Sequence, residues 1–387
     1  MSAGLTTVPL RRLARSLDGR RIPVSREERA AMPGDVPYWG AGGVLDSVDR
    51  ALFNEPLVLL GEDGAPFFEP GRPVAFLLDG LAWVNNHIHV LRPNAKVDRR
   101  FLVHALNAVD FAAYITGSTR DKLTQDDMWQ IRVPLLPVHR QRKIADYLDR
   151  ETARIDNLIA AKQRMVELLE LRRRTLIARF MEALPAKYGA TRIKRVAVMR
   201  AGGTPTVDDP AMWADNGTPW VAISDMTASR VIVETHRTVS TAGLQTKRLP
   251  LGCPGTLLFA MYASVGATAE LGITATWNQA ILGIAGVPSL CETRFLDYWL
   301  QFLRNELRAI VRSNTQDNLN AEQVGNLPFP VVPVTTQQQI VASLDAVTTQ
   351  VDRFLARNAR SLDLLIERRQ ALITAAVTGQ LDIPEAA

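Results

Sequence analysis

The sequence predicts an α+β protein in which two related α/β heads are joined by a long antiparallel two-helix coiled coil with pseudo-twofold symmetry. Three observations predict this fold. Two long amphipathic stretches indicate the helices, a repeat at an offset of 196 positions relates the two halves, and short apolar runs broken by Gly, Pro and Asp indicate sheets. The predicted divisions are 1–137, 138–185, 186–333 and 334–381.

The first long helix is predicted from about His139 to Ala183. Apolar residues recur there at helical spacing, and ~45 residues rising ~1.5 Å each form a rod of roughly 65 Å. Such a rod is too long for one small core and is typical of a spacer. The residues expected to pack along it are Ile144, Leu148, Ile155, Leu158, Met165, Leu169 and Leu176.

The second long helix repeats this pattern 196 positions later, at Ile340, Leu344, Val351, Phe354, Leu365 and Leu372. Lys162 and Asn358 are equivalent polar residues in the two apolar stripes. A polar residue in such a seam costs stability but can fix the register of the helices. Alternatively, Lys162 lays its stem on apolar neighbours and reaches water, and the role of Asn358 stays open.

The heads begin and end alike. Residues 8–14 resemble residues 191–197 at an offset of 183. Strands are expected at 57–60, 73–78, 217–223 and 255–261, and helices near 100–113 and 294–311. Prolines at 134–137 and 330–333 mark where each sheet ends, and Gln141 and Gln337 open the long helices.

Connectivity predicts that the helices are antiparallel. The linker between Pro185 and Ile193 reaches at most roughly 28 Å when fully extended, which is less than half the rod. The second head is therefore expected at the far end of the first helix. The second helix must run back to bury its apolar stripe.

Bulk composition excludes little. A net charge of +5 and a pI near 9.4 fit a nucleic-acid partner but do not require one. Cys253 and Cys291 support neither a disulfide framework nor a zinc site, and Arg172–Arg174 are expected on a solvated helix face. A chain without a leader-like or long apolar segment is expected in the cytoplasm, away from membranes.

The motif search favours a protein without catalytic chemistry. The sequence has no phosphate-binding loop and no acidic-x-Lys nuclease element, and residues 40–43 are interpreted as a turn. His87 and His89 alternate as on a strand and could hold a metal, but no third ligand is near. Residues 326–329 resemble the base-holding loop of adenine methyltransferases, yet Leu327 replaces its first proline, so an exit strand is predicted.

The ordered set of motifs resembles the specificity subunit of type I restriction-modification systems over nearly the whole chain. Residues 37–43, 57–64 and 83–90 look like one target recognition domain of that family. Residues 202–205, 219–226, 261–266 and 277–281 look like another. The segments at 141–144 and 337–340 resemble the starts of its two central helical regions.

By that resemblance, the chain is a non-catalytic DNA-recognition subunit that reads an asymmetric bipartite site in double-stranded DNA, one half per head. It would dock two modification subunits that methylate adenine with S-adenosylmethionine. Two restriction subunits, which use ATP and Mg²⁺, can join them. This chain itself is expected to bind no cofactor and no metal.

Polar and aromatic residues in the loops are the candidate DNA contacts, each with a structural role as its alternative. The base-reading candidates are Tyr38, Trp39, Glu62, Asp63, Asn86 and His87 in the first head and Trp220, Ser224, Asp225, Tyr262, Ser264, Asn278 and Gln279 in the second. Trp39 and Trp220 are expected in the core. The phosphate-contact candidates are Arg20, Arg21, Arg120 and Lys122.

Two other classes of protein remain open. One is a coiled-coil scaffold whose duplicated heads bind proteins. The other is a complete modification enzyme, against which the missing cofactor loop argues.

Overall fold

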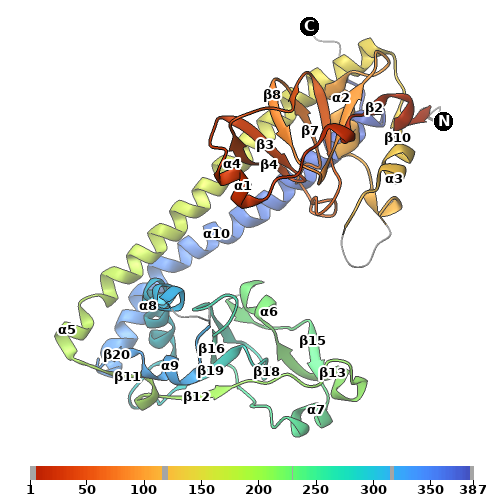
Figure 1. Ribbon diagram of the computed structural model, residues 1–387. Helices are drawn as coiled ribbons and strands as arrows, with labels where there is room; N and C mark the ends of the chain where they lie inside the picture. Colours follow the sequence, from red (N-terminus) through yellow and green to blue (C-terminus); the bar gives the residue numbers. More distant parts are fainter. Residues whose placement is uncertain (1–5, 116–120, 229, 314–317, 384–387) are drawn as a thin grey trace. The chain divides into compact units, whose positions relative to one another are not determined.

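The computed structural model describes residues 6–115, 121–228, 230–313 and 318–383. The chain divides into two units, Met1–Met165 with Asn358–Ala387, and Val166–Arg357. The two long helices, α4 (Val138–Met181) and α10 (Val334–Val377), each contribute residues to both units (Figure 1). Long helices and mixed sheets confirm the predicted α+β class.

The first unit contains two four-stranded sheets. β2 (Ala14–Ser16), β9 (Ile88–Pro93), β6 (Leu57–Gly61) and β7 (Ala75–Leu78) form an antiparallel sheet in that order. The other has the order β4 (Gly43–Val48), β3 (Val36–Gly40), β8 (Leu81–Val84), β5 (Phe53–Asn54), with β3 parallel to β8. β1 (Thr7–Pro9) pairs with β10 (Arg132–Pro134) just before α4. The short helices are α1 (Arg26–Ala30), α2 (Arg99–Asn107) and α3 (Gln125–Gln130).

The second unit repeats most of this topology, with one more strand in the first sheet and one fewer in the second. β12 (Ala197–Ala201), β19 (Ile281–Gly286), β16 (Leu257–Ala260), β17 (Thr268–Leu271) and β14 (Val231–Ile232) form one sheet, and β15 (Arg237–Val239), β13 (Trp213–Val221) and β18 (Thr276–Trp277) form the other. β13 and β18 are parallel, as β3 and β8 are. β11 (Ala190–Arg192) pairs with β20 (Pro328–Pro330) before α10. The other helices are α5 (Leu184–Tyr188), α6 (Ile223–Ala228), α7 (Thr241–Thr246), α8 (Thr293–Ser313) and α9 (Ala321–Asn326).

A buried glutamine fixes the start of α4. Gln141 is fully buried, and its side-chain oxygen accepts a hydrogen bond from the backbone N–H of Asp98 at 2.7 Å. Its amide nitrogen donates to the carbonyls of Lys96 (3.0 Å) and Leu136 (2.7 Å). One side chain therefore satisfies three backbone groups from two segments that meet at the helix.

Gln337 repeats this arrangement at the start of α10. It is also fully buried, accepts from the backbone N–H of Glu292 at 2.9 Å, and donates to the carbonyls of Leu290 (2.9 Å) and Val332 (2.8 Å). We call these two residues the glutamine clamps. Their equivalence shows that the sequence repeat is also a repeat of contacts.

Within each unit the segments of α4 and α10 pack antiparallel, as predicted. In the first unit, Asp156 pairs with Arg369 at 2.8 Å, and Lys162 donates to Asn358 at 3.2 Å further along α4 but earlier in α10. In the second unit, Arg173 pairs with Asp352 at 2.8 Å, and Ile177 shares a core with Leu344. Rising numbers on one helix meet falling numbers on the other.

Lys162 and Asn358 interact with each other, whereas the alternative sent the lysine to water. Asn358 is 5% exposed, and its side-chain oxygen accepts the bond from the Lys162 ammonium. This pair is a polar contact between the two helices. Such contacts favour one helix register because slipping would bury each group without its partner.

Ten of the thirteen residues predicted to pack between the long helices are buried or half-buried, and three are exposed. Five of them are buried, namely Ile144, Leu148, Ile155, Leu344 and Val351, and five are half-buried, namely Leu169, Leu176, Ile340, Leu365 and Leu372. Leu158, Met165 and Phe354 are instead 53%, 51% and 54% exposed. A straight helix drifts ~20° per heptad from a strict seven-residue repeat. Accordingly Ile177 and Ile373, one residue beyond Leu176 and Leu372, are the buried ones.

One basic residue of α4 is not on a solvated face. Arg172 and Arg174 are exposed as expected, but the Arg173 side chain is only 15% exposed. It pairs with Asp352 at 2.8 Å and donates to Gln301 at 2.6 Å. The expectation for Arg173 was wrong because ion pairing to a neighbouring helix offsets the cost of burying a guanidinium.

Candidate nucleic-acid interface

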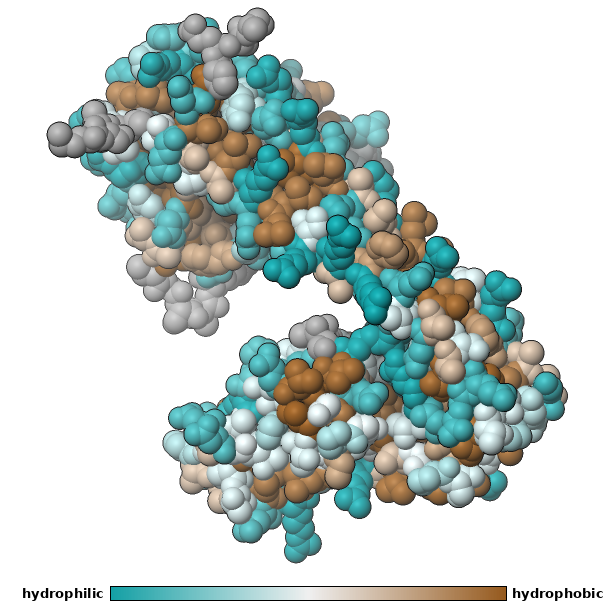
Figure 2. All heavy atoms as spheres, turned by 180° about the vertical axis from the view of Figure 1, so that it is seen from behind, coloured by the Kyte–Doolittle hydropathy of each residue, from teal (hydrophilic) through white to brown (hydrophobic). Residues whose placement is uncertain are grey.

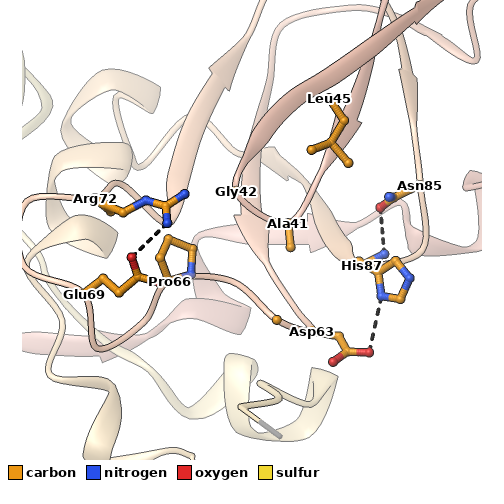
Figure 3. Close-up of a pocket in the computed structure, with 10 residues that line it drawn as sticks. Ala41, Gly42, Leu45, Asp63, Pro66, Glu69, Arg72, Asn85 and His87 are labelled. Atoms are coloured by element: carbon orange, nitrogen blue, oxygen red, sulfur yellow. Dashed lines mark hydrogen bonds and ion pairs between the residues drawn. The ribbon is translucent and has the colours of Figure 1, made fainter. Parts of the chain in front are cut away.

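The first unit has a polar cavity of about 360 Å³ where three loops meet. The loops are the β3–β4 turn, the segment after β6 and the β8–β9 turn, as Figure 3 shows. The residues that line it are Ala41, Gly42, Leu45, Asp63, Gly64, Pro66, Glu69, Arg72, Asn85 and His87. Asp63 and His87 are the only lining residues that the sequence nominated. Arg72, Glu69 and Asn85 were missed because only the fold brings these loops together.

The β8–β9 turn is held by backbone hydrogen bonds. The N–H of Asn85 donates to the carbonyl of Trp39 at 3.1 Å, and its side-chain oxygen accepts from the N–H of His87 at 2.8 Å (Figure 3). The carbonyl of His87 accepts from the N–H groups of Glu62 (2.9 Å) and Asp63 (3.3 Å). These four bonds fix the backbone from which the His87 ring projects.

Charged groups of both signs surround the cavity. Asp63 Oδ2 lies 3.3 Å from Nδ1 of His87, whose side chain is 40% exposed. Arg72 pairs with Glu69 at 2.8 Å, and both side chains are more than half exposed. Carboxylates accept from base amino groups and guanidinium groups donate to guanine, so the cavity offers groups suited to base edges.

A buried ion network lies beside the cavity, where Glu62 precedes Asp63. Arg21 pairs with Glu62 at 2.6 Å and with Asp18 at 3.6 Å. His89 is 1% exposed, and its ring contacts Asp18 at 2.7 Å and the carbonyl of Leu123 at 3.0 Å. Burial by itself raises the pKa of Asp18, but hydrogen bonds from His89 and the Val90 N–H, with the charge of Arg21, bring it below its usual value.

Asp18, Glu62 and His89 are close enough together to resemble a set of metal ligands. The Arg21 guanidinium, however, contacts both carboxylates and supplies the positive charge that the cluster needs. Both ring nitrogens of His89 already have partners. His89 is therefore an internal hydrogen-bonding group of the first head.

Two candidate DNA contacts of the first head are structural. Tyr38 is 2% exposed and belongs to a small core with Met32, Val48 and Trp83, so it cannot read a base. Arg21 is 14% exposed and is held by Glu62, Asp18 and backbone carbonyls, so it is not available to a phosphate. Trp39 packs against the core of the first head, as expected.

The other candidates in this head remain predictions. Asn86 is exposed, and Arg20 and Lys122 have side chains 47% and 52% exposed, paired with Glu55 and Glu62 respectively. Glu62 is only 13% exposed and is engaged by Arg21, Lys122 and His89. Its ion pairs favour a supporting role over base contact. Arg120 lies outside the described residues.

The second head has a turn equivalent to Asn85–His87. Asn278 donates its N–H to the carbonyl of Val221 at 3.0 Å and accepts from the N–H of Ala280 at 2.9 Å. The carbonyl of Ala280 accepts from the N–H of Met261 at 2.8 Å. Asn278 thus corresponds to Asn85, Ala280 to His87 and Met261 to Glu62.

Asp225 is a structural residue of the second head. It is 5% exposed, accepts from the N–H of Ala222 at 2.8 Å and contacts Nδ1 of His236 at 2.5 Å, so its proposed base contact was wrong. Trp220 is 6% exposed, as expected. The remaining candidates stay predictions: Ser224 and Gln279 are exposed, and Tyr262, Ser264 and Asn278 are half-buried.

The second head also contains a stack of one arginine on tryptophan rings that was not predicted from the sequence. The Arg237 guanidinium lies 3.4 Å from the ring centroid of Trp213, which itself packs edge-on against Trp220. Residues 326–329, tested as a base-holding loop, contain no accessible aromatic ring, because Phe329 is 1% exposed and packs against Phe295. Asn326 ends α9 and Pro328 begins β20, so the predicted exit strand starts two residues late.

Across the described part of the chain, no helix combines the length and apolar character that crossing a membrane requires.

Two units of like topology, each completed by segments of α4 and α10, define a duplicated two-headed protein. The family described as type I restriction modification DNA specificity domain matches residues 6–168 and again residues 185–356. The chain belongs to this family of type I restriction-modification specificity subunits.

Known relatives agree with this assignment. A putative type I restriction enzyme specificity subunit of Haemophilus influenzae is 34% identical over 145 residues, or 38% of this chain and 37% of that protein. The EcoBI specificity subunit of Escherichia coli is 29% identical over 128 residues, or 33% of this chain and 27% of that protein. The matched segments therefore span well under half of these relatives.

A solved structure shows the same fold along the whole chain. It comes from a study of complex assembly and conformational transition of the type I R-M system. The comparison covers 98% of this chain and 99% of that chain, with a TM-score of 0.62 and 19% sequence identity.

Proposed function

We propose that this chain is the non-catalytic DNA-recognition subunit of a type I restriction-modification complex and reads a bipartite site, one half per head. The observation that carries the proposal is the doubled family match. Each match covers one head and part of the long helix that follows it. Two DNA specificity domains in one chain provide two readers, and linked readers raise affinity through high effective concentration.

The two half-sites are expected to differ. Equivalent turns have the same hydrogen bonds but different side chains. Glu62 and His87 in the first head occupy the positions that Met261 and Ala280 occupy in the second. Base edges are distinguished by the donors and acceptors that side chains offer. Heads that share a frame but not its side chains should therefore read an asymmetric target.

The long helices are the proposed docking surface for two modification subunits. Exposed apolar side chains occur along them, namely Leu158, Met165, Leu168, Leu171, Val347, Phe354 and Leu364. Figure 2 shows apolar side chains mixed with hydrophilic ones on the face that it displays. Covering them would be favourable at roughly 25 cal/mol per Å² of apolar surface. In this proposal S-adenosylmethionine, ATP and Mg²⁺ are used by the modification and restriction subunits.

DNA footprinting tests the proposal. The full chain is purified with its modification subunit and incubated with DNA from the host genome. Protection of a split sequence, two short blocks separated by an unprotected gap, is expected. Retention of the modification subunit without any protected sequence would instead favour a protein scaffold.

Methyl transfer separates the recognition role from a complete enzyme. The chain alone should transfer no methyl group from S-adenosylmethionine to DNA. Activity of the purified chain alone would contradict a purely recognising role.

A further inference from the structure

We propose that His87 selects a base carrying an exocyclic amino group in the half-site read by the first head, and that Asp63 is the positioning residue for its ring. This inference rests on the proposed function. It assigns one residue of the first head to one chemical distinction between bases. The two heads share the turn from which His87 projects, and only the first head has a polar side chain at that position.

The backbone of this turn is the same in both heads. An asparagine side chain, Asn85 or Asn278, accepts from the N–H two residues later at 2.8 or 2.9 Å. The carbonyl of that later residue, His87 or Ala280, accepts from the N–H of the residue that follows β6 or β16, namely Glu62 at 2.9 Å or Met261 at 2.8 Å. The repeat therefore preserves the frame and changes the side chain that it presents. Such a position can vary specificity without disturbing the fold.

Asp63 determines which nitrogen of the His87 ring is the hydrogen-bond acceptor. Its Oδ2 lies 3.3 Å from Nδ1, as Figure 3 shows, and a carboxylate beside one ring nitrogen favours the proton on that nitrogen. In the neutral imidazole, Nε2 then carries the lone pair. Among the residues that the structure describes, Nε2 has no hydrogen-bond partner, and the side chain is 40% exposed.

An acceptor at this position distinguishes two classes of base. In the major groove, adenine N6 and cytosine N4 present donors, whereas guanine O6 and thymine O4 present acceptors. The Nε2 lone pair therefore favours adenine or cytosine and opposes guanine or thymine. Because the backbone of His87 is fixed by hydrogen bonds, the ring is ordered before DNA arrives, which reduces the entropy lost on binding.

The second head supplies a natural comparison. Ala280 has no polar side-chain atom, so the equivalent position in that head cannot make this distinction. His87→Ala gives the first head the residue that the second head has, and Ala280→His gives the second head the residue of the first. The two substitutions form a matched pair on one frame.

The experiment is selection from DNA with randomised half-sites, using the complete complex of this chain with its modification subunits. Wild-type complex should enrich a split site in which one position of one half prefers adenine or cytosine. His87→Ala should reduce that preference roughly three- to tenfold, and leave the other half-site unchanged. Asp63→Asn should weaken the same preference at that position. Ala280→His combined with Tyr262→Asp, which places a carboxylate at the position equivalent to Asp63, should add a preference for amino-bearing bases in the other half-site.

The outcomes separate this inference from the proposed function. If wild-type complex enriches no split site, the proposed function fails and this inference fails with it. If it enriches a split site that His87→Ala reads with unchanged preference at every position, only the role of His87 is overturned. Equal loss at all positions by a His87→Ala chain that unfolds thermally like wild type would also overturn it, since that result indicates general affinity. If His87→Ala unfolds early, His87→Gln, which keeps an acceptor, should retain the preference, and its loss in folded protein counts against the role.

Discussion

Adjacent arginines of the first head have different environments. Arg20 is 47% exposed and pairs with Glu55, whereas Arg21 is 14% exposed and is held between Glu62 and Asp18. Residue type and position in the chain do not distinguish them. The difference arises because Arg21 neutralises two carboxylates beside the buried ring of His89, where an unpaired charge would be costly.

The network around Asp18 should make the stability of the first head depend on acidic pH. Although burial by itself raises the pKa of Asp18, its hydrogen bonds and the charge of Arg21 hold that pKa below the usual value of an aspartate in the folded state, so its ionised form is stabilised by folding. That contribution is fully present above about pH 4 and is lost as pH falls through the lower folded-state pKa. Asp18→Asn should therefore unfold more easily at neutral pH but show a smaller loss between pH 5 and 3, measured by urea unfolding at each pH.

Asp49→Asn is the matched control for this prediction. Within the part of the chain that the structure describes, Asp49 is a 47%-exposed carboxyl that pairs with its neighbour Arg50. This variant should keep the wild-type pH profile. An Asp18→Asn profile parallel to wild type throughout that pH range would mean that Asp18 is not preferentially ionised in the folded state.

Side-chain contacts hold the first turns of each long helix against its head. Each glutamine clamp satisfies three backbone groups, and two turns further Leu148 or Leu344 is fully buried. Asp149 accepts from Arg100 at 2.9 Å and Asp345, 196 positions after Asp149, accepts from Arg294 at 3.1 Å. The contacts at the starts of the two long helices are therefore more alike than the side chains of the candidate reading loops.

Removal of a glutamine clamp should destabilise the head to which it belongs. Gln141→Ala or Gln337→Ala leaves one N–H and two carbonyls without their side-chain partner, at a cost of roughly 1–3 kcal/mol in unfolding free energy. Gln339→Ala, an exposed position of the same helix, should change it by less than about 0.5 kcal/mol. Chemical denaturation of the full chain measures all three. Equal stability of the clamp and control variants would show that the clamps do not contribute.

Across the two units, the strand order β2-β9-β6-β7 of the first is matched by β12-β19-β16-β17 of the second, whereas the remaining sheet edges and the candidate reading loops differ. The parallel pairs β3–β8 and β13–β18 and the closing pairs β1–β10 and β11–β20 occupy equivalent places. The loops differ: the first head has a cavity lined by charged side chains, and the second has an arginine–tryptophan stack. This combination suits a chain that keeps one architecture while recognising two different DNA sequences.

The length of the long helices should determine the gap between the two half-sites. We expect that deleting one matched helical turn from both α4 and α10 shortens the preferred DNA spacer by about one to two base pairs, since a turn is ~5.4 Å and a base-pair step ~3.4 Å. Methylation sequencing of the host genome measures the spacer. Deletion in one helix alone should disrupt packing, because it breaks the register marked by Lys162 and Asn358.

An unchanged spacer in a folded, active double-deletion variant would contradict this role of the helices.

The class of fold, the duplication, the two long helices and the antiparallel direction of their pairing could all be predicted from the sequence. These follow from periodicity, from the 196-position offset and from a short linker, all of which are local or additive along the chain. The family resemblance was also readable there, because motif order survives where individual residues diverge.

The accessibility of individual polar side chains could not be predicted from the sequence, because it depends on how distant segments pack together. Tyr38, Arg21 and Asp225 looked like loop residues available to DNA, but burial and ion pairing assign them to the fold. Likewise, helical drift moved Leu158, Met165 and Phe354 out of the buried seam. Accessibility depends on segments distant in sequence, such as those that bring Asn85, Asp63 and Arg72 around one cavity. No local pattern contains that information.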